Sequence, residues 1–264
     1  MKFFFDVIYF SGKMNRGDLT MAITDYNMKI ETHCHTKTVS PCGHVEPETI
    51  VDEYIKAGYG AIIITDHFSR NILARFEGNY TDKIDCYLAG YRYCKAYAKK
   101  RAKEGHPSLK VMLGAEILLD TNPSDILLFG ISEEFFYNNP NIFDLDQKGL
   151  YTLLHTKYDA VMYQAHPFRK YCNRQDPKYL DGVEIYNGNL RHENHSDVAL
   201  QWAKENNLKF SSGSDFHQMM DLAKGGLLVP DSIENIHQFK DFITNNEPLY
   251  LVDSAVREKG NLSV

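Results

Sequence analysis

Histidines and carboxylates recur where short apolar segments of this sequence end, and these residue types bind divalent cations. His33 and His35 stand two residues apart in IETHCHT, so both imidazoles point to the same side of an extended strand. Asp215 and His217 repeat this spacing in FSSGSDFH. Either pair alone is equally consistent with ordinary core or surface residues, so the prediction of a metal site depends on several such segments meeting.

Three further segments end in the same way. His67 follows the apolar run AIIIT, with Asp66 beside it as a structural cap or a supporting partner. Glu116 lies among apolar residues in VMLGAEILL, where a buried carboxylate is costly unless it is paired or bridges metal ions. His166 ends VMYQA, and Pro167 then fixes the chain direction. The alternatives are an incidental His67 and a Glu116 that faces outward.

Taken together, these side chains predict a site for divalent ions, roughly one to three per chain. Nitrogen and oxygen ligands without a cysteine cluster suit Zn²⁺, Mn²⁺ or Fe²⁺. Such ions lower the pKa of bound water towards about 7, so the expected chemistry is hydrolysis by an activated water.

The segments that carry these residues alternate between predicted strands and helices. Apolar patterns predict strands at 28–33, 61–65, 110–113, 126–131, 160–165, 182–186, 209–212 and 249–252. Helical periodicity predicts helices at 46–57, 83–104, 146–157, 194–206 and 232–245. This alternation implies an α/β fold with a mainly parallel sheet, and about seven or eight strands favour a (β/α) barrel. Such barrels assemble their sites at the C-terminal strand ends, where the candidate residues stand.

Composition limits the classes of partner. The net charge of −6 argues against nucleic acid, except as a small substrate, whereas a small phosphorylated substrate needs only a local cluster of donors. No apolar run approaches the roughly 20 residues that span a membrane. The cysteines number five and form no CxxC pair, which favours a reducing compartment, so we expect a cytoplasmic protein. Nothing in the sequence indicates the oligomeric state.

Residues 1–27 differ from the rest of the chain. They contain Met14, Met21 and the polar stretch NRGDLT, and the first strong strand follows them. We interpret them as a loosely attached extension or as sequence upstream of the natural start. Asp6 interrupts the initial apolar run, so a signal peptide is not expected. Residues 28–264 are long enough for a single α/β domain with a substantial core.

Five motifs resemble those of the PHP family, which is named for polymerase and histidinol phosphatase domains. They are HCH at 33–35, TDH at 65–67, GAE at 114–116, AHP at 165–167 and GSDFH at 213–217. Their order and spacing agree over nearly the whole chain from Met28 onward. The resemblance implies a distorted seven-stranded (β/α) barrel with up to three metals at its C-terminal face, and hydrolysis of phosphoesters.

The resemblance also implies a ligand set, which it distributes over three ions: His33, His35, Glu116 and Asp215 for the first, His67 and His217 for the second, and Glu116 with His166 for the third. Two positions depart from the family pattern. No aspartate follows the HxH motif, where Cys42 or His44 is a substitute ligand and an idle Cys42 is the alternative favoured slightly. Leu127 stands where the family has a histidine, and Asp125 is expected to face elsewhere. A site with one or two metals is therefore an alternative.

Other residues are candidates for substrate binding and proton transfer. Arg169 is close to His166 and is expected to grip a phosphate with two hydrogen bonds. Lys37 is a second phosphate contact, and Asn187 is expected to reach the substrate or to support a ligand. His217 or His166 would shuttle a proton if metal binding leaves it free. Each of these side chains also has an ordinary solvated or structural interpretation.

Two other functions compete with phosphoester hydrolysis at this point. An amidohydrolase-type site would use the same water to open a C–N bond, but such sites usually have a bridging lysine, and Glu116 takes that place here. A catalytically degenerate metal-binding module is the other possibility, because of the missing aspartate and Leu127.

Overall fold

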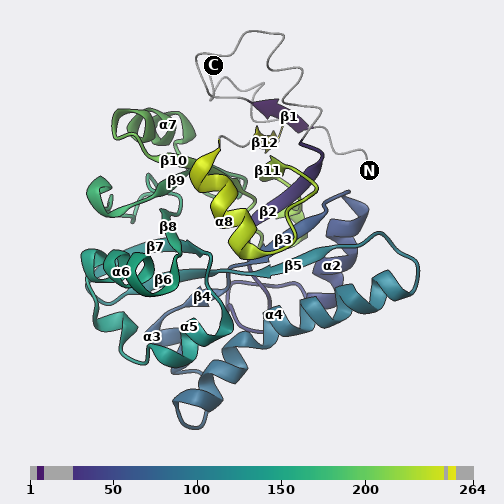
Figure 1. Ribbon diagram of the computed structural model, residues 1–264, viewed down its shortest axis with the longest axis horizontal. Helices are drawn as coiled ribbons and strands as arrows, with labels where there is room; N and C mark the ends of the chain where they lie inside the picture. The colour runs from purple at the N-terminus through teal and green to yellow at the C-terminus, as the bar shows by residue number, and fades with distance from the viewer. Residues whose placement is uncertain (1–4, 9–25, 247–248, 254–264) are drawn as a thin grey trace.

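The computed structural model describes residues 5–8, 26–246 and 249–253, and Figure 1 shows their arrangement. Strands and helices alternate along the chain, which confirms the α/β class. In the described residues the strands form two six-stranded sheets. The first has the order β1 (Phe5–Ile8), β12 (Leu249–Asp253), β11 (Gly225–Val229), β2 (Met28–Cys34), β3 (Ala61–Ile64) and β5 (Lys110–Leu113). The second has the order β10 (Lys209–Gly213), β9 (Gly182–Asn187), β8 (Val161–Gln164), β7 (Asn122–Phe129), β6 (Ala115–Leu119) and β4 (His67–Phe68).

The chain passes from the first sheet to the second at two breaks, where one strand ends and its continuation joins the other sheet. Strand β3 continues as β4 after Thr65 and Asp66, and β5 continues as β6 after Gly114. Backbone bonds cross these breaks, from Gly114 N to Ile64 O at 2.9 Å and from Glu116 N to Asp66 O at 3.2 Å. The pairing of the described strands does not close into a barrel, so the expected closed seven-stranded barrel is not confirmed.

The sheets are mixed, and the expectation of a mainly parallel sheet is wrong. Strands β6 and β7 form an antiparallel hairpin whose last partners are Leu119 and Asn122. Strand β7 is also antiparallel to β8, and β11 is antiparallel to β2 and β12. The short turn after Leu119 leaves no room for a crossover helix, which a parallel connection requires.

The helices follow the predicted periodicity closely. Helix α2 (Pro47–Lys56) ends before Gly58, whose φ of +73° suits a left-handed stop. Helix α4 (Tyr80–Lys103) starts three residues before the predicted 83, because Asn79 and Asp82 form a capping box. Helices α7 (Ser196–Glu205) and α8 (Ile236–Asn245) lie within their predicted ranges, and α6 (Gln147–Leu153) passes into a π-helical turn at Leu154–Tyr158. Short helices α3 (Arg70–Leu73) and α5 (Glu133–Asn138) were not predicted.

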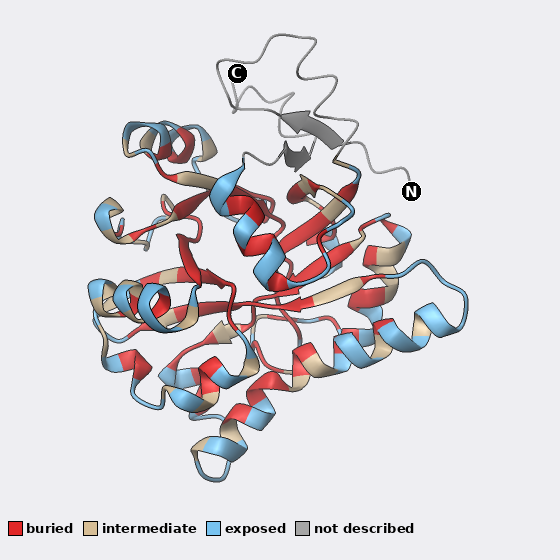
Figure 2. Cartoon of the chain, viewed as in Figure 1, coloured by how far each residue is buried: buried red, intermediate tan, exposed pale blue. Residues whose placement is uncertain are grey.

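Buried residues gather along the strands, and exposed residues lie on the outer sides of the helices (Figure 2). One apolar cluster joins side chains of both sheets, for example Ile63 of β3 and Leu127 of β7, and α8 adds Phe239 to it. A larger cluster lies where α2, α4 and α7 cover the sheets. The described residues include no helix long and apolar enough to cross a membrane.

The N-terminal segment 1–27 is described only in part. Its residues Phe5–Ile8 form β1, which pairs antiparallel with β12 near the other end of the chain. Residues 9–25 lie outside the described residues, so their interpretation as an extension stays a prediction, as does the single domain over residues 28–264.

Candidate metal centre

The structure brings together the seven residues that the sequence predicts as metal ligands. Each stands on or just after a strand: His33 and His35 at the end of β2, His67 in β4, Glu116 in β6, His166 after β8, and Asp215 and His217 after β10. The His67 side chain is 27% exposed, and the other six residues are buried. The cluster is thus a packed polar core with one imidazole at its edge.

Glu116 lies at the centre of the cluster. Its Oε1 is 3.3 Å from His33 Nε2 and 3.0 Å from His166 Nε2. Its Oε2 is 3.3 Å from His35 Nε2 and 2.8 Å from His67 Nδ1. Four imidazoles from three segments therefore face one carboxylate, which is the position expected of a ligand shared between ions.

Asp215 closes the opposite side of the cluster. Its Oδ1 is 3.3 Å from His33 Nε2, 3.4 Å from His35 Nε2 and 3.3 Å from His217 Nδ1. Its Oδ2 accepts a hydrogen bond of 2.6 Å from Arg169 Nη2. The two carboxylates thus enclose the HxH pair between them.

The ligand atoms form overlapping groups within which all atoms lie less than 4.8 Å apart. The inner group, whose members are all buried, consists of His33, His166 and Asp215. The outer group, which reaches the surface through one imidazole, consists of His35, His67 and His217. Glu116 groups with His33 and His35, so it connects the two.

Three buried atoms at the centre of this cluster, His33 Nε2, His35 Nε2 and Glu116 Oε2, face one another without a well-directed hydrogen bond to any described residue. Leaving a buried polar atom unpaired costs about 1–3 kcal/mol, so three that face one another call for a shared partner. Imidazole nitrogens and a carboxylate oxygen together form a donor set for Zn²⁺, Mn²⁺ or Fe²⁺. The residues therefore fit a divalent ion.

The ionisation of the cluster reflects its opposed charges. Burial alone would raise the pKa of Glu116, but the facing His33 and His67 hold that pKa well below its usual range. Burial likewise opposes protonation of His33, yet Asp215 and Glu116 raise the pKa of its imidazole well above the usual value. In the metal-free protein, protons on the imidazoles therefore neutralise the carboxylates. Bound cations would do so in the metal-loaded protein.

His166 and His217 differ from each other in charge at neutral pH. Burial lowers the pKa of His166, but contacts with Cys172 and Glu116 outweigh it and raise that pKa to about 10. Burial and the neighbouring His35 lower the pKa of His217 to about 3. His217 is therefore neutral at pH 7, as a metal ligand or a proton acceptor must be.

The backbone is held in unusual conformations at two cluster residues. His166 has a φ of +27° and Asp215 a φ of +50°, in the left-handed region that favours glycine. Gly213 allows a close approach nearby, because a Cβ there would lie 2.5 Å from His33 Cβ. Such conformations concentrate at functional sites, where the surrounding structure enforces them.

Buried acids support the ligands from behind. Glu184 Oε1 accepts a hydrogen bond from His33 Nδ1 at 2.9 Å, which directs Nε2 into the cluster. Asp66, expected to be structural, accepts a bond of 2.7 Å from the Ser40 hydroxyl, whose oxygen lies 3.3 Å from His35 Nδ1. Glu31 accepts the backbone N–H groups of His33 at 2.9 Å and of two other residues.

Arg169 reaches the cluster, as expected, and Asn187 lies behind it. Arg169 Nη2 donates to Asp215 and also to Asn187 Oδ1 at 2.7 Å, while its Nε donates to Asn194 Oδ1 at 2.7 Å. Asn187 is buried and also donates to Glu184 at 2.8 Å, so it supports other residues within the protein.

The remaining candidates lie at the edge of the cluster or outside it. Lys37 pairs with Glu46 on the surface, and its side chain is 53% exposed. His44 is exposed, and only its backbone N–H bonds to His217 O, at 2.7 Å. Cys42 is half-buried. Burial lowers the pKa of His67, but the charge of Glu116 and a hydrogen bond with Cys42 outweigh it and raise that pKa well above its usual value.

Asp125 faces the cluster, so the expectation that it faces elsewhere is wrong. One of its oxygens lies within 4.8 Å of ligand atoms of both His67 and Glu116. Because β7 runs antiparallel to β6, the earlier residue Asp125 is nearer the cluster, and Leu127 packs into the apolar core. Burial and the charge of Glu116 raise the pKa of Asp125, so an ion between these carboxylates would relieve their repulsion.

Sequence reasoning also missed the role of Glu184. Its signal was an acid inside the otherwise apolar strand GVEIYN, the same signal that identified Glu116.

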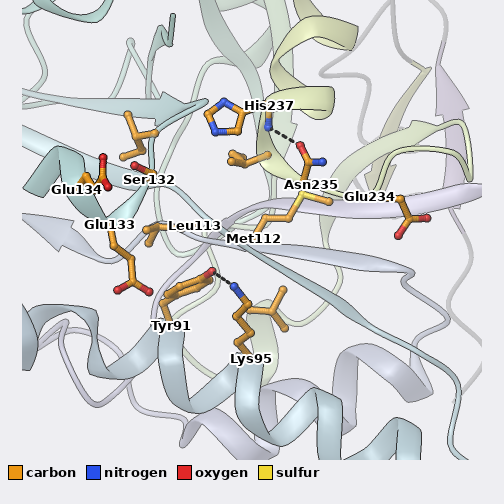
Figure 3. Close-up of a pocket in the computed structure, with 13 residues that line it drawn as sticks. Tyr91, Lys95, Met112, Leu113, Ser132, Glu133, Glu134, Glu234, Asn235 and His237 are labelled. Carbon is orange, nitrogen blue, oxygen red and sulfur yellow. Dashed lines mark hydrogen bonds between the residues drawn. The ribbon is translucent and has the colours of Figure 1, made fainter. Parts of the chain in front are cut away.

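A separate cavity of about 460 Å³ lies between α4, β5 and the start of α8 (Figure 3). Two of its polar side chains have partners: Lys95 donates to Tyr91 at 2.7 Å, and Asn235 accepts from the backbone of His237 at 3.1 Å. None of the predicted site residues lines this cavity.

Comparisons with known proteins agree with the motifs. The chain matches the PHP domain over residues 31–224, and no curated protein sequence matches it. Its fold is similar to that of PsfC from Pseudomonas syringae PB-5123, with 16% identity, a TM-score of 0.58, and coverage of 88% of this chain and 93% of the other.

Two other solved structures are less similar, each with a TM-score of 0.46. A candidate metal-dependent phosphoesterase from Bifidobacterium adolescentis shares 15% identity, with 82% of this chain and 96% of the other covered. An amidohydrolase from Chromobacterium violaceum shares 14%, with 86% and 99% covered. The family match spans most of the chain and every cluster residue, so this protein belongs to the PHP domain family, whose members are generally metal-dependent hydrolases.

Proposed function

We propose that this protein is a metal-dependent phosphoesterase that acts on small phosphate monoesters. The observation that carries the proposal is the set of three buried atoms without a well-directed hydrogen bond, His33 Nε2, His35 Nε2 and Glu116 Oε2. The guanidinium of Arg169 bonds to Asp215, which lies beside them. The first feature suits divalent cations, and the second suits a phosphate oxygen.

Arg169 is held so that one nitrogen is left for a ligand. Its Nε and Nη2 donate to protein oxygens, whereas Nη1 has no hydrogen bond to any described residue. The side chain is 15% exposed, and we expect its Nη1 to donate to a phosphate oxygen. One bond from Nη1 replaces the two-bond grip expected from the sequence, because the other edge of the guanidinium is occupied.

The depth of the cluster favours a terminal phosphate. Of the seven ligands only His67 is more than a tenth exposed, and the inner group is buried throughout. A phosphodiester inside a polymer would need room for chain on both sides of the phosphorus, whereas a monoester presents a compact end. This supports small monoesters over small diesters as substrates.

Divalent ions held by the inner and outer groups and Glu116 would activate water and neutralise phosphate charge. The protein itself supplies orientation and proton transfer. His217 Nδ1 lies 2.8 Å from Asp215 O and donates to that carbonyl, which leaves Nε2 as its accepting nitrogen. His166 is held between Glu116 and Cys172, so His217 is the better candidate for a proton acceptor where the outer ion leaves its Nε2 free.

The proposal is tested by metal analysis and ester hydrolysis on purified protein. We expect bound Zn, Mn or Fe and turnover of p-nitrophenyl phosphate with added Mn²⁺, at a higher kcat/KM than for bis(p-nitrophenyl) phosphate. His33→Ala and Asp215→Ala should abolish turnover, while His106→Ala, at an exposed histidine outside the cluster, should not. Hydrolysis of amides without phosphatase activity would favour the amidohydrolase alternative, and bound metal without turnover of either would favour a non-catalytic module.

A further inference from the structure

Glu184 is a buried carboxylate that contacts both the candidate ligands of the cluster and a residue that supports them. It is 1% exposed and lies on β9. Its Oε1 accepts from His33 Nδ1 at 2.9 Å, and its Oε2 accepts from His166 N at 3.0 Å and Asn187 Nδ2 at 2.8 Å. All three neighbours donate, so the position suits a carboxylate and no group that must itself donate.

These contacts continue into a closed ring. Asn187 Oδ1 accepts from Arg169 Nη2 at 2.7 Å, and the same nitrogen donates to Asp215 Oδ2 at 2.6 Å. Asp215 Oδ1 in turn lies 3.3 Å from His33 Nε2. The ring therefore runs through five side chains: His33, Glu184, Asn187, Arg169 and Asp215.

The ring connects potential metal ligands to the proposed phosphate donor. His33 and Asp215 belong to the inner group, and Arg169 Nη1 has no hydrogen bond to any described residue. Glu184 orients His33 directly and orients Arg169 through Asn187. A shift of this one carboxylate is therefore transmitted to both sides.

We propose that Glu184 is a positioning residue that couples metal binding at the inner group to phosphate binding by Arg169. The phosphate side of this inference rests on the proposed function, whereas the metal side does not. Asn187, expected from the sequence to reach the substrate or support a ligand, becomes the connection between the two sides.

The packing leaves Glu184 little freedom to adopt another pose. A Cβ on Gly213 of β10 would lie 3.0 Å from Glu184 Oε1, so the neighbouring strand presses against the carboxylate. An amide at this position must turn its NH₂ towards at least one of the three donors. Glu184→Asp would keep the charge but be one methylene too short to reach His33 Nδ1.

Glu31→Gln is the matched control, because Glu31 is another fully buried carboxylate beside the inner group. It contacts His33 only through the backbone N–H, and its Oε1 accepts all the backbone donors while Oε2 accepts from Tyr54. A glutamine there can keep the backbone bonds with its carbonyl oxygen. The control therefore changes a buried carboxyl group, whose pKa burial raises to about 7, without turning a ligand side chain.

The test measures Zn²⁺ affinity by chelator competition and inorganic phosphate binding to the metal-loaded proteins by calorimetry. We expect Glu184→Gln and Glu184→Asp to weaken Zn²⁺ binding by about 10- to 100-fold. Both should also weaken phosphate binding by about fivefold or more, and Asn187→Ala should weaken phosphate alone, with Zn²⁺ affinity within about threefold of the parent. Thermal unfolding of each metal-free variant checks that it folds.

Several outcomes would overturn the coupling. The proposal fails if both Glu184 variants bind Zn²⁺ within about threefold of the parent, or if Glu31→Gln loses as much affinity as they do. It also fails if they lose Zn²⁺ affinity but bind phosphate normally at saturating metal. None of these measurements depends on turnover, so a failure of the proposed enzymatic activity remains distinguishable.

Discussion

The inner and outer groups of the cluster contain similar ligands but are supported differently. In the inner group, charged side chains hold the ligands: Glu184 holds His33, and Arg169 holds Asp215. In the outer group the partners are weaker, a serine hydroxyl at 3.3 Å from His35 and a backbone carbonyl at His217, and His67 is partly exposed. Preorganised and buried ligands bind a cation more tightly, so we expect an inner ion that resists removal and an outer ion that exchanges.

The largest effect is expected at Glu116, because it connects the two groups. Glu116→Gln removes a negative charge that faces four imidazoles, so both ions should be lost and turnover should fall by about 10³-fold or more. Elemental analysis and p-nitrophenyl phosphate kinetics measure these losses. Retention of both ions would show that Glu116 is not shared between them.

Single histidine variants should separate the groups. His33→Ala should remove the tightly held ion, whereas His67→Ala should leave it bound and lose only the exchangeable one. Turnover should fall by about 10²-fold or more in each variant, since both ions contribute to charge neutralisation. Metal content after dialysis distinguishes them, and equal loss in both variants would contradict a division into two groups.

Metal affinity should depend on pH in a direction set by the histidines. The pKa values of His33 and His67 lie well above the usual value in the metal-free protein, so both carry protons at neutral pH that a metal must displace. Affinity should therefore rise with pH, by about tenfold per unit for each proton released, and fall on acidification. His217, whose pKa is about 3, contributes no such proton above pH 4. Calorimetry in buffers of different ionisation enthalpy counts the protons; a pH-independent affinity would contradict the prediction.

The smallest effect is expected at Cys42. It hydrogen-bonds to His67, and the groups of potential ligands in the described residues do not include it. Cys42→Ala should therefore change metal affinity by about threefold or less. Loading with Co²⁺ provides the check, because a thiolate ligand adds an intense sulfur-to-metal absorption band, and such a band in the parent that disappears in the variant would make Cys42 a ligand.

The positions of the cluster residues could be predicted from sequence because each lies at or near the end of a predicted strand. Burial of His33 and Glu116 then follows from the strands on which they lie, and burial of Asp215 from its place just after β10. The direction of β7 could not be predicted, since an apolar run reads alike in parallel and antiparallel sheets, and this is why Asp125 was misplaced.

Whether the sheets close into a barrel could also not be predicted from the sequence. The breaks at Thr65–Asp66 and Gly114 decide which strands pair, and they depend on contacts between distant segments such as Glu116 N to Asp66 O. The role of Glu184 could not be assigned from the sequence, because its partners His33 and His166 come from two distant segments that only the fold brings together.

The left-handed backbone at His166 and Asp215 has a consequence for how this protein reaches its native state. Each such residue costs on the order of 1–3 kcal/mol, and nothing in an unfolded chain imposes that conformation. If ion coordination repays part of this cost, refolding in a chelating medium should recover less native protein than refolding with Zn²⁺ or Mn²⁺ present. Metal supply would then limit the yield of the folded chain as well as its activity.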